Sequence, residues 1–216
     1  MFVKRANGFL LARQGEEQIM TATMCKGLEA KTFDHLQGLE GISQEQLEQH
    51  YKLYNGYVAN VNKWMENMAK FEPGSQEWNE VKRRFGFEIN GVVLHELYFN
   101  NMKPNGGELP ESSKLMSVIK ECFGSYDAWL ADFKATGKMR GIGWVITYQC
   151  SCTGRLINVW VSDHENGHPA GFTPVLVMDV WEHAFTVDYK PTEKGSYIDA
   201  FFKNINWSEV ESRLNA

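Results

Sequence analysis

The sequence has no excess of positive charge: 22 Lys and Arg residues stand against 27 Asp and Glu residues, a net charge of −5. Binding to nucleic acid depends largely on cations that neutralise phosphates, so the composition argues against a general nucleic-acid-binding protein. No apolar run reaches the roughly 18 residues that a membrane helix needs, so we expect no membrane span.

Cysteine is scarce, and its spacing is not that of a disulfide framework. The residues are Cys25, Cys122, Cys150 and Cys152. The N-terminal segment also lacks the long apolar core and small-residue cleavage site of a secretory signal. We therefore expect a thiol-bearing enzyme of the cytoplasm. Cys150-Ser151-Cys152 resembles half of a soft-metal site, but two hairpin cysteines are the simpler interpretation because no partner pair follows.

Hydrophobic periodicity and turn residues predict an α+β fold in two parts. After an N-terminal tail over 1–40, we expect a helical hairpin domain over 41–104 and an α+β domain over 105–216 with a small three-stranded antiparallel sheet. The turn-rich stretch 103–110 separates the two. The predicted helices cover 43–71, 77–100, 113–123, 125–135, 197–205 and 208–214, and the predicted strands cover 144–148, 156–161 and 174–179.

The start of the first helix has its own local signal. Ser43 is the predicted N-cap, and Gln46 stands three residues later, as in a capping box.

The most informative segment is Pro174–Ala184. Five of the six residues Pro174 to Asp179 are apolar or proline, which predicts a buried strand that ends in a carboxylate. His183 follows Asp179 by four residues. A carboxylate oxygen beside an imidazole suits an intermediate first-row metal such as iron, manganese or zinc.

Several motifs resemble those of the iron/manganese superoxide dismutases, and they span most of residues 41–207. The string Asp179-Val180-Trp181-Glu182-His183-Ala184 is similar to the C-terminal signature of that family. The other matching motifs are His50 with the following Tyr57-Val58-Ala59-Asn60, His95 with the following aromatics, Pro104-Asn105-Gly106-Gly107-Glu108, and Gly141-Ile142-Gly143-Trp144.

The resemblance implies that His50, His95, Asp179 and His183 bind one iron or manganese ion per subunit, with iron slightly favoured. Three neutral nitrogens and one carboxylate would balance a divalent or trivalent ion and leave a fifth position for solvent. Taken alone, each histidine is more often an ordinary core residue. The resemblance also implies that Tyr57 is the active-site tyrosine.

Departures from the family pattern concern the group that hydrogen-bonds metal-bound solvent. Gly91 stands where iron-type members usually carry a glutamine, and His164 aligns with the glutamine of manganese-type members, as in a less common, metal-ambiguous branch. We expect His164 to reach the bound solvent; the alternative is an exposed loop residue. Val93 replaces a frequent tryptophan, which puts one wall of the pocket in doubt.

The function implied by the resemblance is dismutation of superoxide to oxygen and hydrogen peroxide. Two alternatives stay open: another mononuclear iron enzyme, such as an oxygenase, and a metal-free interaction module that kept the fold. The resemblance also implies a homodimer, or a dimer of dimers, through Glu182 and His183. One other bond across the family's dimer is missing, since Leu53 or Tyr54 replaces a histidine and Thr186 replaces a tyrosine.

Overall fold

The computed structural model describes residues 27–215, so most of the predicted N-terminal tail lies outside the described residues. Residues 27–33 run beside helix α2 (Gln44–Met68), where Leu28 N donates to Asn62 Oδ1 over 2.6 Å and Lys31 N donates to the Tyr54 hydroxyl over 2.9 Å. A short 3-10 helix, η1 (Asp34–Leu36), then buries Leu36 in the core.

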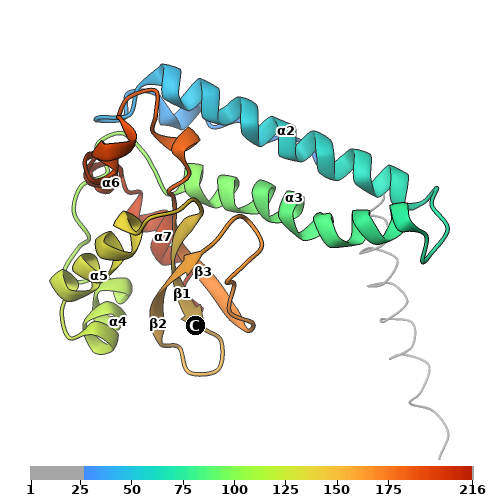
Figure 1. Cartoon of the computed structure of the whole chain (residues 1–216). Coiled ribbons are helices and arrows are strands. Elements are labelled where there is room, and N and C mark those ends of the chain that lie inside the picture. Colours follow the sequence, from blue (N-terminus) through green and yellow to red (C-terminus); the bar gives the residue numbers. More distant parts are fainter. Residues whose placement is uncertain (1–26, 216) are drawn as a thin grey trace, which may run out of the picture.

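Two long helices, α2 and α3 (Gln76–Asn100), form a hairpin that extends away from the sheet (Figure 1). Ser43 caps α2 as predicted, because its hydroxyl accepts from Gln46 N over 3.0 Å. The capping-box prediction is wrong in its second half. The Gln46 side chain does not turn back to Ser43 but reaches the chain after β3.

The predicted three-stranded antiparallel sheet is confirmed, with strand order β2-β1-β3. The strands are β1 (Trp144–Cys150), β2 (Leu156–Val161) and β3 (Phe172–Asp179). β3 begins two residues before its predicted start at Pro174. Proline is accepted there because β3 is an edge strand and the pairing shifts register at Thr147/Tyr148, opposite that proline.

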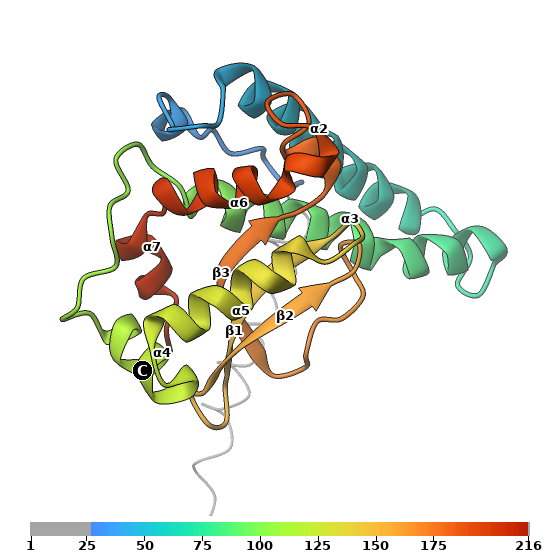
Figure 2. The ribbon, with the colours of Figure 1, turned by 60° about the vertical axis from the view of Figure 1, so that its left-hand side comes forward.

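Helices cover the sheet on both sides (Figure 2). Helix α5 (Tyr126–Lys138) packs against β1 and β2, with α4 (Lys114–Phe123) beside it, and α3 packs against β3. α5 runs three residues past its predicted end. Gly137 in this extension lies close to β3, since a Cβ there would lie 2.8 Å from Met178 Cε. None of the helices within residues 27–215 is both long and apolar enough to cross a bilayer.

The chain after β3 returns to the first helix hairpin. β3 ends at Asp179, and the short helix η2 (Glu182–Ala184) contacts α2. The 3-10 helix η3 (Pro191–Glu193), α6 (Lys194–Lys203) and α7 (Trp207–Ser212) then complete the core. This return brings the end of β3 and η2 against the first turns of α2 and the second half of α3.

Candidate metal centre

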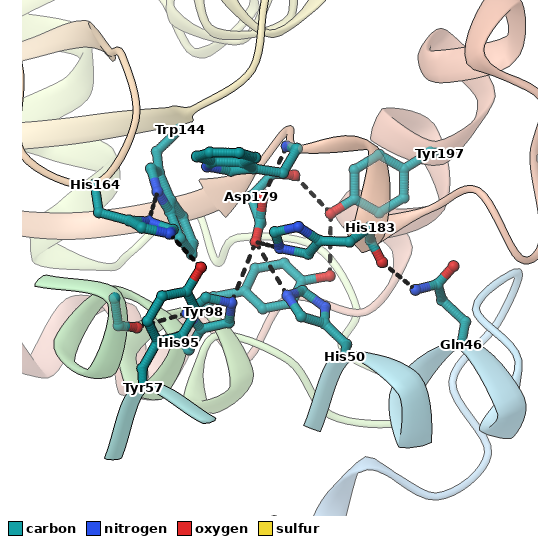
Figure 3. Close-up of polar contacts among 12 residues, drawn as sticks. Gln46, His50, Tyr57, His95, Tyr98, Trp144, His164, Asp179, His183 and Tyr197 are labelled. Atoms are coloured by element: carbon teal, nitrogen blue, oxygen red, sulfur yellow. Dashed lines mark hydrogen bonds and ion pairs between the residues drawn. The ribbon is translucent and has the colours of Figure 1, made fainter. Parts of the chain in front are cut away.

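Four side chains from four elements converge at that junction (Figure 3). They are His50 of α2, His95 of α3, Asp179 at the end of β3 and His183 of η2, and one donor atom from each lies within 4.8 Å of all the others. Asp179 Oδ2 is 3.0 Å from His50 Nε2, 3.2 Å from His183 Nε2 and 3.7 Å from His95 Nε2. The four residues predicted as ligands are therefore one cluster.

Asp179 is held at its carboxylate and at its backbone carbonyl. Its Oδ1 accepts from Trp181 N over 2.8 Å, which leaves Oδ2 to face the imidazoles. The Tyr197 hydroxyl donates to the Asp179 carbonyl over 2.8 Å and lies 3.0 Å from the Tyr98 hydroxyl. Burial by itself would raise the pKa of Asp179, but the neighbouring His183 and His50 outweigh it and hold that pKa well below its usual range. The group is thus a buried anion.

His95 tests whether the cluster fits a cation. Its Nδ1 lies 2.5 Å from the Gly91 carbonyl and must donate to it, so Nε2 keeps its lone pair. That Nε2 is buried and has no hydrogen-bond partner among residues 27–215. Burial also lowers the pKa of His95 well below 6.5, so the ring stays neutral. A lone pair 3.7 Å from a buried carboxylate oxygen is unfavourable unless a positive ion lies between them.

The dimensions agree with such an ion. Ligand atoms about 2.0–2.2 Å from a metal lie roughly 3–4 Å from one another. The three imidazole nitrogens lie at such distances from Asp179 Oδ2. Three imidazole nitrogens and one carboxylate oxygen suit a first-row transition metal of intermediate softness. Calcium and magnesium prefer oxygen ligands, and this set contains only one. The cluster therefore has the composition and spacing of a transition-metal site.

Gln46 supports His183 and does not complete a capping box at the start of α2. Its Nε2 donates to the His183 carbonyl over 2.7 Å, and its Oε1 accepts from Val187 N over 3.0 Å. The side chain is only 1% exposed. One signal for this contact was present in the sequence: Gln46 precedes His50 by one helical turn, so both lie on the same buried face.

Beside the cluster, three side chains form a hydrogen-bonded row. Trp144 Nε1 donates to His164 Nδ1 over 3.0 Å, and His164 Nε2 lies 2.7 Å from the Tyr57 hydroxyl. Because the indole can only donate, Nδ1 is the acceptor, and the neutral ring carries its proton on Nε2. Burial lowers the pKa of His164 to about 4, so the ring is neutral at pH 7. His164 therefore donates to Tyr57, whose own hydroxyl proton stays available.

Both ring nitrogens of His164 have protein partners among the described residues, and its expected reach to metal-bound solvent stays a prediction. The alternative of an exposed loop residue is wrong, since His164 is fully buried and stacks on Trp181 with ring centroids 5.0 Å apart. The hydrogen bond from His164 toward the cluster ends on Tyr57.

The absence of a side chain at Gly91 has a steric reason. A Cβ at this position would lie 2.6 Å from Tyr57 Cδ1, closer than any real contact. The Tyr57 ring thus occupies the space that a side chain at Gly91 would need. The doubt about the pocket wall is resolved too: Val93 is 44% exposed and points away, while Trp144 meets the His95 ring edge-on at 5.0 Å.

Two family models match most of the chain. The α-hairpin domain of the iron/manganese superoxide dismutases matches residues 33–103, and the C-terminal domain of the same family matches residues 111–213.

Named relatives agree with these matches. An iron superoxide dismutase of Aquifex pyrophilus is 41% identical over 192 residues, which cover 84% of this chain and 89% of the relative. An iron enzyme of Cupriavidus metallidurans is 35% identical over 82% of this chain and 91% of its own. A manganese superoxide dismutase of Haloferax volcanii is 35% identical over 80% of this chain and 86% of its own. Together with the cluster of three histidines and one aspartate, these matches establish that the chain belongs to the iron/manganese superoxide dismutase family.

Proposed function

We propose that this protein dismutates superoxide with one iron or manganese ion per subunit, held by His50, His95, Asp179 and His183. The observation that carries the proposal is the buried, unpartnered Nε2 of His95, which faces the carboxylate of Asp179. A bound iron or manganese ion would alternate between two charges, taking an electron from one superoxide and giving it to another. The products are oxygen and hydrogen peroxide.

The surrounding residues have separate tasks in this proposal. Asp179 supplies the negative charge that balances the ion. Tyr57 is half-buried at the edge of the cluster, and its free hydroxyl proton is directed by the bond from His164. His183 is the most exposed of the four ligands, with 22% of its side chain exposed against 1% or less for the other three, so it is the ligand that a second subunit can reach. Peroxide needs two protons, and Tyr57 is the group placed to deliver one.

A comparison of His95→Ala with His35→Ala tests the proposal. His35 is exposed and outside the cluster, so its replacement controls for the loss of an imidazole. Each protein would be loaded with iron or manganese, dialysed, and measured for bound metal and superoxide turnover. We expect His35→Ala to keep both and His95→Ala to lose both. Full metal and full turnover in His95→Ala would reject the assignment.

The same samples separate the two alternatives. A metal-free interaction module would bind no stoichiometric iron or manganese in the wild-type protein. Another mononuclear iron enzyme would bind iron but fail to turn over superoxide. Enzymes of that type commonly use two histidines and one carboxylate with open positions. Four protein ligands leave less room for an organic substrate, which favours dismutation.

We propose that two subunits pair through Glu182 and His183. His183 Nε2 points to Asp179, and its Nδ1 has no hydrogen-bond partner within residues 27–215. A metal-bound imidazole generally needs an acceptor on its other nitrogen. Glu182 is exposed beside it, and Glu182 of a second subunit related by a two-fold axis would supply that acceptor in both directions. The exposed positions of Leu53 and Thr186 agree with the loss of the family's second bond across this interface.

Sedimentation of Glu182→Ala across concentration tests the pairing, with metal content measured on the same samples. We expect weaker association and weaker metal retention together. Glu121→Ala is the matched control because Glu121 is an exposed glutamate on α4, on the other side of the sheet. A tight dimer with full metal in Glu182→Ala would reject the role of this residue.

Two further expectations from the sequence remain proposals. We place the protein in the cytoplasm, in keeping with the absence of disulfides among Cys122, Cys150 and Cys152; fractionation with a periplasmic marker would test this. We also keep the division into domains at 41–104 and 105–216, in which each domain supplies two of the four ligands. Limited proteolysis near 103–110 would test that boundary.

A further inference from the structure

The turn between β1 and β2 brings two cysteine thiols into contact. Cys150 ends β1, Cys152 lies in the turn, and their Sγ atoms are 3.0 Å apart. The backbone fixes this arrangement: Cys150 N donates to the Arg155 carbonyl over 2.9 Å, and Gly154 N donates to the Cys150 carbonyl over 2.8 Å. Cys152 is exposed, and Cys150 keeps 7% of its surface.

The two thiols are not equivalent. Hydrogen bonds from the Cys152 thiol and then from the Thr153 side chain lower the pKa of Cys150 to about 7. The contact with Cys150 raises the pKa of Cys152. A thiolate is the nucleophilic form of cysteine, so Cys150 is the reactive member and Cys152 the neighbour that can resolve an oxidised sulfur.

We propose that Cys150 and Cys152 form a second redox site, a dithiol that hydrogen peroxide converts to an intrachain disulfide. The proposal stands on the contact between the two sulfurs in a fixed turn. A disulfide bond is about 2.05 Å long, so the sulfurs need to approach by about 1 Å. Hydrogen peroxide is the product of the proposed dismutation, and only in naming this source does the inference rest on the proposed function.

The chemistry balances without another reactant. The Cys150 thiolate attacks one peroxide oxygen, an S–O bond forms, the O–O bond breaks, and the departing hydroxide takes a proton to become water. Cys152 then attacks the sulfenic sulfur, an S–S bond forms, the S–O bond breaks, and a second water leaves with the proton of Cys152. Two thiols lose two electrons and two protons in total, and one peroxide is reduced to two waters.

The dithiol is remote from the metal centre. β1 begins at Trp144, which pairs with Asp179, and ends at Cys150, so the strand separates the two sites by about 20 Å at roughly 3.4 Å per residue. Replacement of either cysteine therefore leaves the ligands and their supports in place. Oxidation can be followed on the thiols themselves, independently of superoxide turnover.

The sequence permits a direct measurement on the full-length, metal-loaded protein. Cleavage at Arg140 and Arg155 gives a peptide that contains Cys150 and Cys152 and no other cysteine, and Cys122 falls in a separate peptide after Lys120. The protein would be titrated with reagent hydrogen peroxide, alkylated, digested and analysed by mass spectrometry. We expect the 141–155 peptide to lose two hydrogens and both alkylation sites, at a rate at least about tenfold above oxidation of Cys122.

Two variants identify the order of events. Cys152→Ser removes the resolving thiol but keeps a hydroxyl donor, so Cys150 should stop at the sulfenic acid and be trapped by a dione reagent. Cys150→Ser should abolish the fast reaction, and Cys122→Ser should leave it unchanged. A reductant should restore alkylation of the wild-type peptide, whereas a chelator should not, because a metal held by the two thiols would also block alkylation.

Four outcomes would overturn the inference. They are oxidation no faster than that of Cys122, a mixed disulfide with Cys122, direct conversion to sulfinic acid, and recovery of alkylation by chelator alone. All use added peroxide, so they are independent of whether the protein dismutates superoxide. Loss of superoxide turnover with a normal disulfide would count against the proposed function and not against this site.

Discussion

Replacement of Gly91 by alanine should reveal how tightly Tyr57 is packed against α3. In the interior of a helix, glycine to alanine normally stabilises a protein by roughly 1 kcal/mol. At Gly91 the new Cβ would lie 2.6 Å from Cδ1 and 2.8 Å from Cγ of the Tyr57 ring. Such overpacking costs about 1–3 kcal/mol. The two effects together predict a net loss of about 0–2 kcal/mol.

Gly56→Ala in α2 is the matched control. A Cβ at Gly56 meets nothing within 4 Å, so that variant should gain the full roughly 1 kcal/mol. The two variants should thus differ by about 1–3 kcal/mol, and each kcal/mol corresponds to about 2–4 °C in the unfolding midpoint for a chain of this size. Superoxide turnover of Gly91→Ala should fall by about 10- to 100-fold, because the displaced hydroxyl of Tyr57 is no longer positioned to deliver its proton.

The assay is thermal or urea unfolding of the metal-loaded proteins, with turnover measured in parallel. Gly91→Ala made in the Tyr57→Ala protein is the decisive comparison. Without the Tyr57 ring, Gly91→Ala should stabilise the protein as much as Gly56→Ala does. The coupling between positions 91 and 57 should then be about 1–3 kcal/mol. If Gly91→Ala stabilises the protein while Tyr57 is present, the steric argument fails.

Three other predictions follow from single contacts. Gln46→Leu should lower the free energy of unfolding by about 2–4 kcal/mol and weaken metal retention, because the His183 carbonyl and Val187 N lose their partner. Urea unfolding and metal analysis test this, and unchanged values would contradict it. His164→Gln should keep the metal but change the activity ratio of iron-loaded to manganese-loaded enzyme, and an equal ratio would show that His164 does not influence the centre. Oxidation of the cysteine pair should accelerate about tenfold per pH unit below 7 and level off above about 8, since the Cys150 pKa is about 7 and thiolate accumulates as pH rises; a rate independent of pH would contradict this.

The sequence predicted those features that depend on periodicity or on short motifs. The long helices have a repeating apolar pattern, and the central strand is a short run rich in β-branched and aromatic residues, so their existence and approximate bounds were accessible. The ligand cluster was accessible because His50, His95, Asp179 and His183 each stand in a recognisable motif, and the structure brings them together.

Contacts between distant segments were not accessible in the same way. Gln46 satisfies the local pattern of a capping box, yet its side chain bonds a carbonyl 137 positions away. Similarly, His168 stands in a loop rich in turn residues, yet its Nδ1 lies 2.5 Å from the Tyr148 hydroxyl, 20 positions away. The sequence places Gln46 on the buried face of its helix, but it specifies neither the carbonyl that Gln46 meets nor the hydroxyl that His168 meets, because the tertiary fold brings each pair together.

Two departures from the family pattern, glycine at 91 and histidine at 164, meet at Tyr57 in the structure. A glutamine at position 91 would need the volume that the Tyr57 ring fills, so glycine at 91 and the observed place of Tyr57 require each other. That place puts the Tyr57 hydroxyl 2.7 Å from His164, whose other nitrogen is satisfied by Trp144. With no glutamine at position 91 or 164, the free hydroxyl proton of Tyr57 is the one that we propose for the metal centre. The environment of His164 then sets the direction of that proton.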